Sequence, residues 1–377
     1  MDTKARRGSS QRPQPVLMIP LRRCGSHALR LRLNFSPDFY SPYPLHIVDL
    51  MPKLPLYGDL ADDGNYFRLV ADVVGLQAIN IVKWPDISFD PAEIFEAIEG
   101  ETRSIHRIVW ELLLRAGERH RASVIMDKSL DSVHYAGELM ALFPDMLFLN
   151  VVRDPRAQVA SMNRAIIHDF DSTLNALTWE KAYRAARALA QHYPGRVLTV
   201  RYEDFLANQE QILRRICDFM GLRFLPEMLN IETSVEAQQL SRRSDLWVSN
   251  FSAPILANKD KFRSLLGADE IEIIETVTRD HMAHYGYEFM TPAQAVIPDA
   301  EGLAARARRS AEAGEQAWRD LARNNYRDYV VRRLRANYLA GRGAQNDKLV
   351  DAGNREMAAH PATRGASGLE NYRIQQA

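Results

Sequence analysis

Short apolar runs that alternate with helix-like stretches constrain this chain more than any other sequence feature. The apolar runs are PVLMIP, SVIMDK, LFLNVV and RVLTVRYED, at residues 15–20, 123–128, 147–152 and 196–204. Helix-like stretches such as VHYAGELMALF and NQEQILRRICDFMGL separate or follow these runs. Alternation of this kind predicts a parallel sheet covered by helices. We therefore expect an α/β fold with a central parallel sheet.

The composition narrows the classes of function. Apolar residues make up 46% and charged residues 25% of the 377 residues, which is typical of a soluble globular protein. The formal net charge is +0, so the chain lacks the overall positive field of nucleic-acid-binding proteins, and any anion site must be a local cluster. Nucleic acid is therefore not an expected partner.

Cysteine use and hydropathy indicate a compartment. Cys24 and Cys217 are too few for a disulfide framework or a Cys-rich zinc site, which favours a reducing environment. The N-terminal stretch is polar and Pro-rich without an apolar leader core, and no apolar run approaches the length of a membrane span. We expect a cytoplasmic protein with no membrane partner. The excess of arginine over lysine hints at a GC-rich, bacterial genome.

Changes in composition divide the chain into four expected parts. Residues 1–14 are expected to be disordered, and residues 15–290 to form the main domain. Residues 291–340 are rich in Ala and Arg and predict a helical C-terminal extension, while residues 341–377 contain few large apolar side chains and predict a disordered tail. A homodimer completed by a docked C-terminal element is compatible with this organisation.

The stretch PLRRCGSH, between an expected strand and an expected helix, is the first candidate site. Gly25 and Ser26 at a helix start offer backbone N–H groups and the positive end of the helix dipole to an anion, and Arg23 adds a formal charge. The Walker A pattern and its lysine are absent. A phosphate or sulfate cradle and an ordinary strand-to-helix turn both fit this stretch when it is taken alone.

The stretch VVRDPRAQVAS, residues 151–161, is the second candidate site. Arg153 follows a predicted strand at its carboxyl end, where open α/β sheets bind ligands, and Pro155 is suited to begin the next helix. Ser161 would lie near two turns into that helix. The spacing allows Arg153 and Ser161 to hold one anion, and it equally allows a capped helix with a surface arginine.

Four blocks in order resemble the sulfotransferases that use 3′-phosphoadenosine 5′-phosphosulfate (PAPS). They are similar to the family's 5′-phosphosulfate loop, the block that ends in its 3′-phosphate motif, its V-x-Y-E-D-L block and its closing helix. The four blocks are PLRRCGSHALRLRL, MDKSLDSVHYAGELMALFPDMLFLNVVRDPRAQVAS, VLTVRYEDFLANQEQILRRICDFMGLRF and GADEIEIIETVTRDHMAHYGYEF. The resemblance implies a P-loop-like sulfotransferase fold, PAPS as sulfuryl donor, 3′-phosphoadenosine 5′-phosphate (PAP) as product, and no metal requirement.

The resemblance also implies roles for single residues. Arg153 and Ser161 would hold the 3′-phosphate, and Tyr202 would contact the adenine. Lys128 would lie near the sulfuryl group and, with Arg23, stabilise the leaving phosphate. The 5′-phosphosulfate would be held by the loop residues Arg22, Arg23, Cys24, Gly25, Ser26 and His27. In this loop a cysteine replaces the usual small hydroxyl residue and a histidine replaces a threonine, so one charge-assisted hydrogen bond, worth about 1.5–3 kcal/mol, is expected to be missing.

The catalytic base is assigned from a segment that resembles H-P-x-x-x-x-x-x-E-x-H-F-F-D of the heparan sulfate sulfotransferases. In SPDFYSPYPLHIVDL, Pro44 stands in place of the glutamate, while His46 and Asp49 match the histidine and the aspartate. His46 is therefore the first candidate for the base, with Asp49 orienting it. Leu130 stands where cytosolic sulfotransferases carry their histidine, and His134 is the second candidate, although helix packing also explains it.

The acceptor is not identified by the sequence, and two other functions stay open. We expect a small hydroxylated metabolite or a sugar that accepts through a hydroxyl or an amine, because no basic stripe for a polyanionic glycan is visible in the sequence. One alternative is a P-loop-fold kinase or other nucleotide phosphotransferase, against which the missing Walker lysine counts. The other is a donor-binding protein without turnover, which the replaced glutamate and the altered loop suggest.

Overall fold

The computed structural model describes residues 12–244 and 256–341 of the chain. All of the predicted tail at residues 341–377 except its first residue, and most of the predicted disordered N-terminus at residues 1–14, lie outside these described residues.

A five-stranded parallel sheet forms the centre of the described chain, with strand order β2-β3-β1-β4-β5. The strands are β1 Gln14–Ile19, β2 Phe39–Tyr40, β3 Val124–Asp127, β4 Leu147–Val152 and β5 Val197–Arg201. The predicted α/β class with a central parallel sheet is confirmed. The sequence does not predict β2, because two residues carry no periodic signal.

The order of the strands creates one divergence point at the carboxyl edge of the sheet. β1 lies between β3 and β4. The chain leaves β1 toward β2 at one edge of the sheet and leaves β4 toward β5 at the other edge. In open α/β sheets the ligand crevice lies where two such connections diverge. Both predicted anion-binding stretches follow these two strands.

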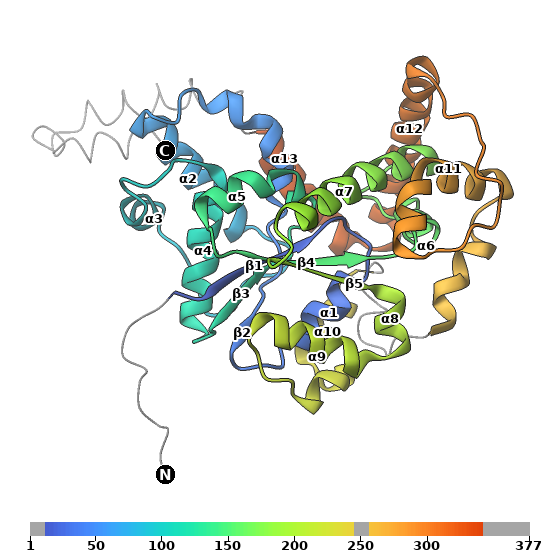
Figure 1. Cartoon of the computed structure of the whole chain (residues 1–377). Helices are drawn as coiled ribbons and strands as arrows, with labels where there is room; N and C mark the ends of the chain where they lie inside the picture. Colours follow the sequence, from blue (N-terminus) through green and yellow to red (C-terminus); the bar gives the residue numbers. More distant parts are fainter. Residues whose placement is uncertain (1–11, 245–255, 342–377) are drawn as a thin grey trace, which may run out of the picture. The chain divides into compact units, whose positions relative to one another are not determined.

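Helices cover both faces of the sheet, and Figure 1 shows α1 and α9 on one face and α7 on the other. The helices of the first half of the chain are α1 Ser26–Leu33, α2 Asp63–Ala78, α3 Pro91–Ala97, α4 Ile105–Arg119, α5 Ala136–Leu142, α6 Pro155–Met162 and α7 Ser172–His192. Those of the second half are α8 Tyr202–Ala207, α9 Gln209–Met220, α10 Val235–Ser241, α11 Ala268–Tyr285, α12 Ala300–Asn324 and α13 Tyr326–Ala340. The last two confirm the predicted helical C-terminal region.

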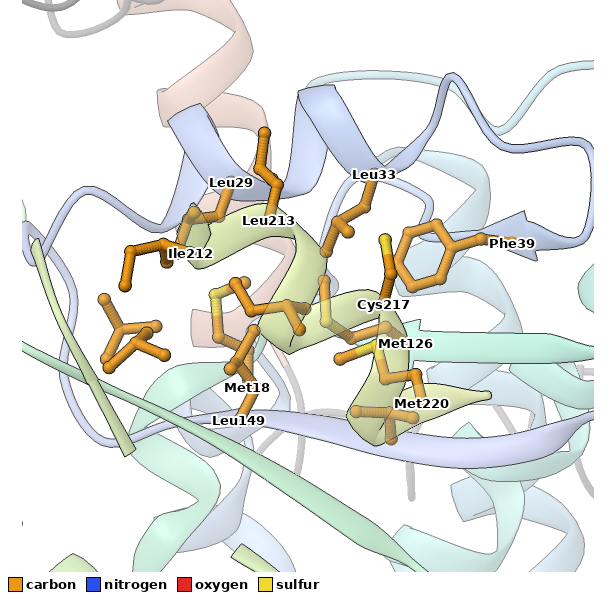
Figure 2. Close-up of a cluster of buried hydrophobic side chains, with 14 of the residues drawn as sticks. Met18, Leu29, Leu33, Phe39, Met126, Leu149, Ile212, Leu213, Cys217 and Met220 are labelled. Atoms are coloured by element: carbon orange, nitrogen blue, oxygen red, sulfur yellow. The ribbon is translucent and has the colours of Figure 1, made fainter. Parts of the chain in front are cut away.

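A buried apolar cluster fixes α1 against the sheet. Alternate residues of β1 point into it, among them Met18, because side chains of a strand alternate between its two faces. Figure 2 shows Met18 with Leu29 and Leu33 of α1 and Leu213 and Cys217 of α9. Burying each leucine contributes about 1.5–3 kcal/mol relative to leaving it exposed. The start of α1 is thereby held at the carboxyl end of β1.

The chain forms two compact units. Of the described residues, the first unit includes 12–42, 113–244 and 256–318 and the second 43–112 and 319–341, so the division falls within α4 and α12. The first unit contains the whole sheet and both stretches that are predicted to bind anions. The second contains α2, α3, α13 and the segment that carries His46.

Candidate active site

The connection from β1 to α1 has a backbone that requires glycine at one position. Gly25 has φ 93°, in the left-handed region that disfavours residues with a Cβ atom. A Cβ at Gly25 would lie 2.2 Å from the nearest ring atom of Tyr202. The carbonyl oxygen of Gly25 accepts a hydrogen bond from the Ala28 backbone N–H at 3.0 Å, which begins α1. The loop therefore turns tightly into the helix beneath an aromatic ring.

The two predicted anion-binding stretches meet in this loop. Arg153, at the end of β4, donates through Nη1 to the carbonyl oxygen of Arg23 at 2.7 Å. Arg23 donates through Nε to the hydroxyl oxygen of Ser161 at 3.0 Å. Asp154 caps α6 by accepting from the Arg156 backbone N–H at 2.9 Å. Arg153 and Ser161 each form a hydrogen bond with Arg23, so the structure brings the three residues into one cluster. The spacing in the sequence allows this arrangement but does not require it.

Lys128 is buried beside the loop without a carboxylate partner. Its side chain is 2% exposed, and its Nζ lies 3.5 Å from the hydroxyl of Ser26. Among the described residues no carboxylate forms a salt bridge with it. Burial, followed by the charge of Arg30, lowers the pKa of Lys128 to about 7. A buried cation of this kind is costly unless an anion joins it.

Two loop residues that depart from the family pattern are neutral. Burial raises the pKa of the Cys24 thiol to about 11, so the thiol keeps its proton. Burial, with the charges of Lys128 and Arg30, lowers the pKa of His27 well below its usual range. The positive charge of the loop therefore comes from its two arginines, with Lys128 beside it.

Arg22 and Tyr202 complete the residues predicted around the donor. Arg22 donates through Nε to the carboxylate of Asp131, in the turn after β3. The guanidinium of Arg153 lies 5.3 Å from the centre of the Tyr202 ring, a cation–π arrangement. Burial raises the pKa of Tyr202, so its hydroxyl stays protonated. The pKa of His134, the second candidate for the base, is lowered, mainly by burial and secondly by the charge of Lys181.

Gln158 is a buried residue that sequence reasoning misses. It is 0% exposed, and its Nε2 donates to the carbonyl oxygen of Arg22 at 2.8 Å. Its Oε1 accepts from Trp179 Nε1 at 3.0 Å and from the Tyr183 hydroxyl at 2.8 Å. One side chain of α6 therefore ties the loop after β1 to α7. No local pattern signals it, because a glutamine one turn into a helix usually faces solvent.

The loop after α6 supplies a second missed residue, His168. Its Nε2 atom is buried and has no hydrogen-bond partner among the described residues. Burial, followed by the charges of Arg22 and Arg23, lowers the pKa of His168 to about 3. The imidazole is therefore neutral. No spacing within the motifs points to this histidine.

A polar network holds the residues that follow Arg153. The Asp154 backbone N–H donates to Glu203 at 3.0 Å, and Glu203 accepts from the hydroxyl of Tyr287 at 2.8 Å. Arg156 pairs with both Asp154 and Glu275, and all three side chains are largely buried. Breaking such a buried pair by removing one partner costs about 3–5 kcal/mol. The network fixes the end of β4 and with it the direction of Arg153.

In the second unit, His46 and Asp49 lie in a short turn. His46 has φ 50° and ψ 54° and precedes the 3-10 turn η1 Ile47–Asp49. The carboxylate of Asp49 accepts from Arg335 of α13 at 2.9 Å. The carbonyl oxygen of Pro44, at the position of the family's glutamate, accepts from Asn80 at 3.3 Å. Arg335 is a partner of this turn that the sequence does not predict.

In residues 12–244 and 256–341, no group of three or more His, Cys, Asp or Glu side chains is arranged to hold a metal ion. No helix in that part of the chain is both long and apolar enough to cross a membrane.

The fold and the site define an α/β protein with a cationic loop at the point where the connections of its parallel strands diverge. A model of the sulfotransferase family matches residues 15–227. The chain belongs to the sulfotransferase family.

Several relatives are similar to parts of the chain. Carbohydrate sulfotransferase 2 of human and of mouse are each 33% identical over 113 residues, which cover 30% of this chain and 20% of theirs. A putative protein-tyrosine sulfotransferase of Caenorhabditis briggsae is 22% identical over 167 residues, which cover 43% of this chain and 57% of that protein. The match thus spans about a fifth of the length of carbohydrate sulfotransferase 2.

Two solved structures are similar to the chain at low identity. The sulfotransferase domain of the Synechococcus PCC 7002 olefin synthase has 23% identity and a TM-score of 0.49, and the alignment covers 75% of this chain and 98% of that one. The sulfotransferase domain from the curacin biosynthetic pathway has 20% identity and the same TM-score of 0.49, with 74% of this chain and 100% of that one covered.

Proposed function

We propose that the protein transfers a sulfuryl group from PAPS to a hydroxyl or amine of an acceptor, with PAP as the second product. The observation that carries the proposal is the buried Lys128 beside Ser26, which has no salt bridge to a carboxylate in residues 12–244 and 256–341, next to a loop that contains Arg23 and meets Arg153. Cations that converge in excess of the carboxylates beside them are complementary to a bound anion of high charge.

We propose that PAPS is held at both of its anionic groups, the 3′-phosphate and the 5′-phosphosulfate. Arg153 and Ser161 are proposed to hold the 3′-phosphate, and the start of α1 with Lys128 to hold the 5′-phosphosulfate. Arg23 contacts Ser161 and lies in the loop itself, so we propose that it lies between the two anionic groups. The ring of Tyr202, packed over Gly25, offers an apolar face for the adenine.

The reaction then needs three things from the protein. The acceptor oxygen or nitrogen attacks sulfur, the bond from sulfur to the bridging oxygen of the phosphate breaks, and the acceptor loses a proton. Arg23 and Lys128 would stabilise the negative charge that develops on the leaving phosphate. Binding would place the acceptor in line with that bond. A base would take the proton, and we propose His46 for it, with Asp49 in the same turn and His134 as the second candidate.

The acceptor class and the compartment are also part of the proposal. Carbohydrate sulfotransferase 2 is a relative of part of the chain, so a sugar or small-molecule hydroxyl is our proposed acceptor class. Both cysteines are unpaired and buried, which is typical of a reducing compartment such as the cytoplasm.

The donor class can be tested by ligand-induced stabilisation. PAP, ATP and NAD are each added to the protein with and without Mg²⁺, and the melting temperature is recorded. A ligand present at 100 times its dissociation constant stabilises by about 2.7 kcal/mol. We expect stabilisation by PAP alone, independent of Mg²⁺. Stabilisation only by ATP with Mg²⁺ would indicate the kinase alternative instead.

Turnover and the base are tested together with sulfur-labelled PAPS. Transfer to N-acetylglucosamine and to a panel of phenols is measured for wild type and for His46→Asn. We expect the variant to keep PAP affinity and to lose about 10²- to 10⁴-fold in rate, as for a missing general base. Normal transfer by His46→Asn would move the role to His134. PAP binding without transfer to any member of the panel would favour a donor-binding protein without turnover.

A further inference from the structure

We propose that Arg335 is a positioning residue that fixes the turn carrying His46 and Asp49. The proposal rests on the proposed function only in that it takes His46 as the proton acceptor. Arg335 belongs to α13, which lies beyond the residues 15–227 that match the family model. The C-terminal region of this chain would thus contribute to a site that the family pattern assigns to residues near the N-terminus.

One guanidinium nitrogen joins both ends of the turn. The Nη2 atom of Arg335 donates to the carbonyl oxygen of His46 at 3.1 Å and to the carboxylate of Asp49 at 2.9 Å. The same carbonyl accepts from the Asp49 backbone N–H at 3.1 Å, and Leu50 donates to Ile47 at 2.8 Å. The guanidinium therefore closes the turn that these backbone bonds define, and its charge faces the only carboxylate within that turn.

The backbone of His46 is in a conformation that needs such support. Its φ of 50° and ψ of 54° lie in the left-handed region, which is unfavourable for a residue with a Cβ atom. Residues held there persist when the surrounding contacts determine them. The direction of the imidazole depends on this backbone, because the side chain leaves from the same Cα atom.

Arg335 is itself held in place. It is 9% exposed, and one turn further along α13 the hydroxyl of Tyr338 donates to the carbonyl oxygen of Asp72 in α2 at 3.0 Å. Gly75 allows this approach, because a Cβ there would lie 2.1 Å from that hydroxyl oxygen. A docked helix thus presents the guanidinium to the turn.

The chemistry of arginine assigns the role. A guanidinium is not deprotonated in proteins, so Arg335 cannot accept the acceptor's proton. Arg335 contacts the backbone carbonyl of His46 and the carboxylate of Asp49, so its function is to orient the turn that carries these two residues. A misplacement of about 1 Å at a reacting group lowers a rate about 10²-fold, so a distant positioning residue can be visible in turnover.

The test compares Arg335→Gln and Arg335→Lys with Tyr338→Phe, which removes a hydrogen bond of the same helix without touching the turn. Hydrogen exchange of the Asp49 and Leu50 amides is measured in each variant, together with PAP affinity and transfer from sulfur-labelled PAPS. We expect Arg335→Gln to accelerate exchange of these two amides at least about tenfold and to lower the transfer rate about 10- to 100-fold, with PAP affinity unchanged. Arg335→Lys should keep most of the wild-type amide protection and most of the wild-type transfer rate, since it keeps the charge.

The outcomes separate this proposal from the proposed function. Unchanged exchange of the two amides in Arg335→Gln would overturn the role of Arg335, whatever the acceptor is. Equal effects of Arg335→Gln and Tyr338→Phe would also overturn it, because they would reveal general helix docking. Normal transfer by His46→Asn with accelerated exchange in Arg335→Gln would reject the base and retain Arg335 as the residue that holds the turn.

Discussion

The Nε atom of Arg23 donates a hydrogen bond to the hydroxyl of Ser161 across 3.0 Å, although 138 positions separate the two residues. Arg153 reaches the backbone of Arg23 from the end of β4. The two stretches that the sequence predicts to bind anions therefore form one cluster, in which each stretch contacts the other.

Removing Arg153 should abolish recognition of the 3′-phosphate. Wild type is expected to bind PAP much more tightly than adenosine 5′-phosphate, and Arg153→Ala to erase most of that difference. The loss of a charge-assisted contact to a dianion costs about 2–3 kcal/mol, or roughly 30- to 100-fold in affinity for PAP. Isothermal titration calorimetry measures both ligands. Arg184→Ala, at a side chain that is 74% exposed, is the control and should change neither affinity. Equal binding of the two nucleotides by wild type would reject the assignment.

Gly25 should not tolerate a methyl group. Gly25→Ala combines a φ of 93° with a contact of 2.2 Å to the ring of Tyr202, so the ring or the loop must move. We expect a loss of about 2–4 kcal/mol in the free energy of unfolding and a loss of PAP affinity. Gly221→Ala is the matched control, because its φ is 69° and nothing lies within 4 Å of the added atom. It should cost only about 1–2 kcal/mol and leave PAP binding intact. Equal losses in chemical denaturation would mean that backbone strain alone accounts for Gly25.

Lys128 should couple donor binding to proton uptake. Its pKa of about 7 in the free protein must rise when an anion binds beside it, because the charged form is then favoured. Above pH 7 PAP binding should therefore take up a proton, and PAP affinity should fall with increasing pH. Calorimetry at pH 8 in two buffers of different ionisation enthalpy detects the proton. Lys128→Met should abolish the uptake and Lys181→Met, at an exposed lysine, should not.

The lowered pKa of Lys128 also affects the stability of the protein without ligand, and stability should rise with pH where PAP affinity falls. Burial lowers the pKa of Lys128 from 10.5 to about 7, so the unfolded state binds more protons than the folded state between these values. The free energy of unfolding should therefore rise with pH from about 7 toward 10 through this group. Denaturation of wild type and Lys128→Met across this range gives the difference. A pH-independent difference between the two proteins would contradict the shifted pKa.

Ser310 of α12 should support the loop that follows Ser161. Its hydroxyl accepts from the Phe170 backbone N–H at 3.0 Å and donates to Asp169 at 2.8 Å. Ser310→Ala leaves both groups without this partner, so we expect a loss of about 1–3 kcal/mol in the free energy of unfolding. The control is Glu312→Ala, at an exposed position of the same helix, which should be neutral. An unaltered unfolding midpoint in Ser310→Ala would show that α12 does not stabilise this loop.

The sequence by itself determined the class of fold and the place of the two strand-to-helix connections where it predicts anion binding. The apolar runs before Arg23 and Arg153 are long enough to be read as buried strands, and parallel strands end at one edge of a sheet. Glycine, serine and proline then mark the starts of the following helices. These signals are local, since each arises from residues that are neighbours in the chain.

The tertiary structure alone decided which side chains meet. Gln158 on the carbonyl of Arg22 and Arg335 on the turn of His46 are contacts between residues far apart in sequence. Hydrophobic periodicity predicts which face of a helix is buried, and it carries no information about the polar partner that the face will meet. That pairing depends on the order of the strands and on the docking of α6 and α13, which only the folded chain sets.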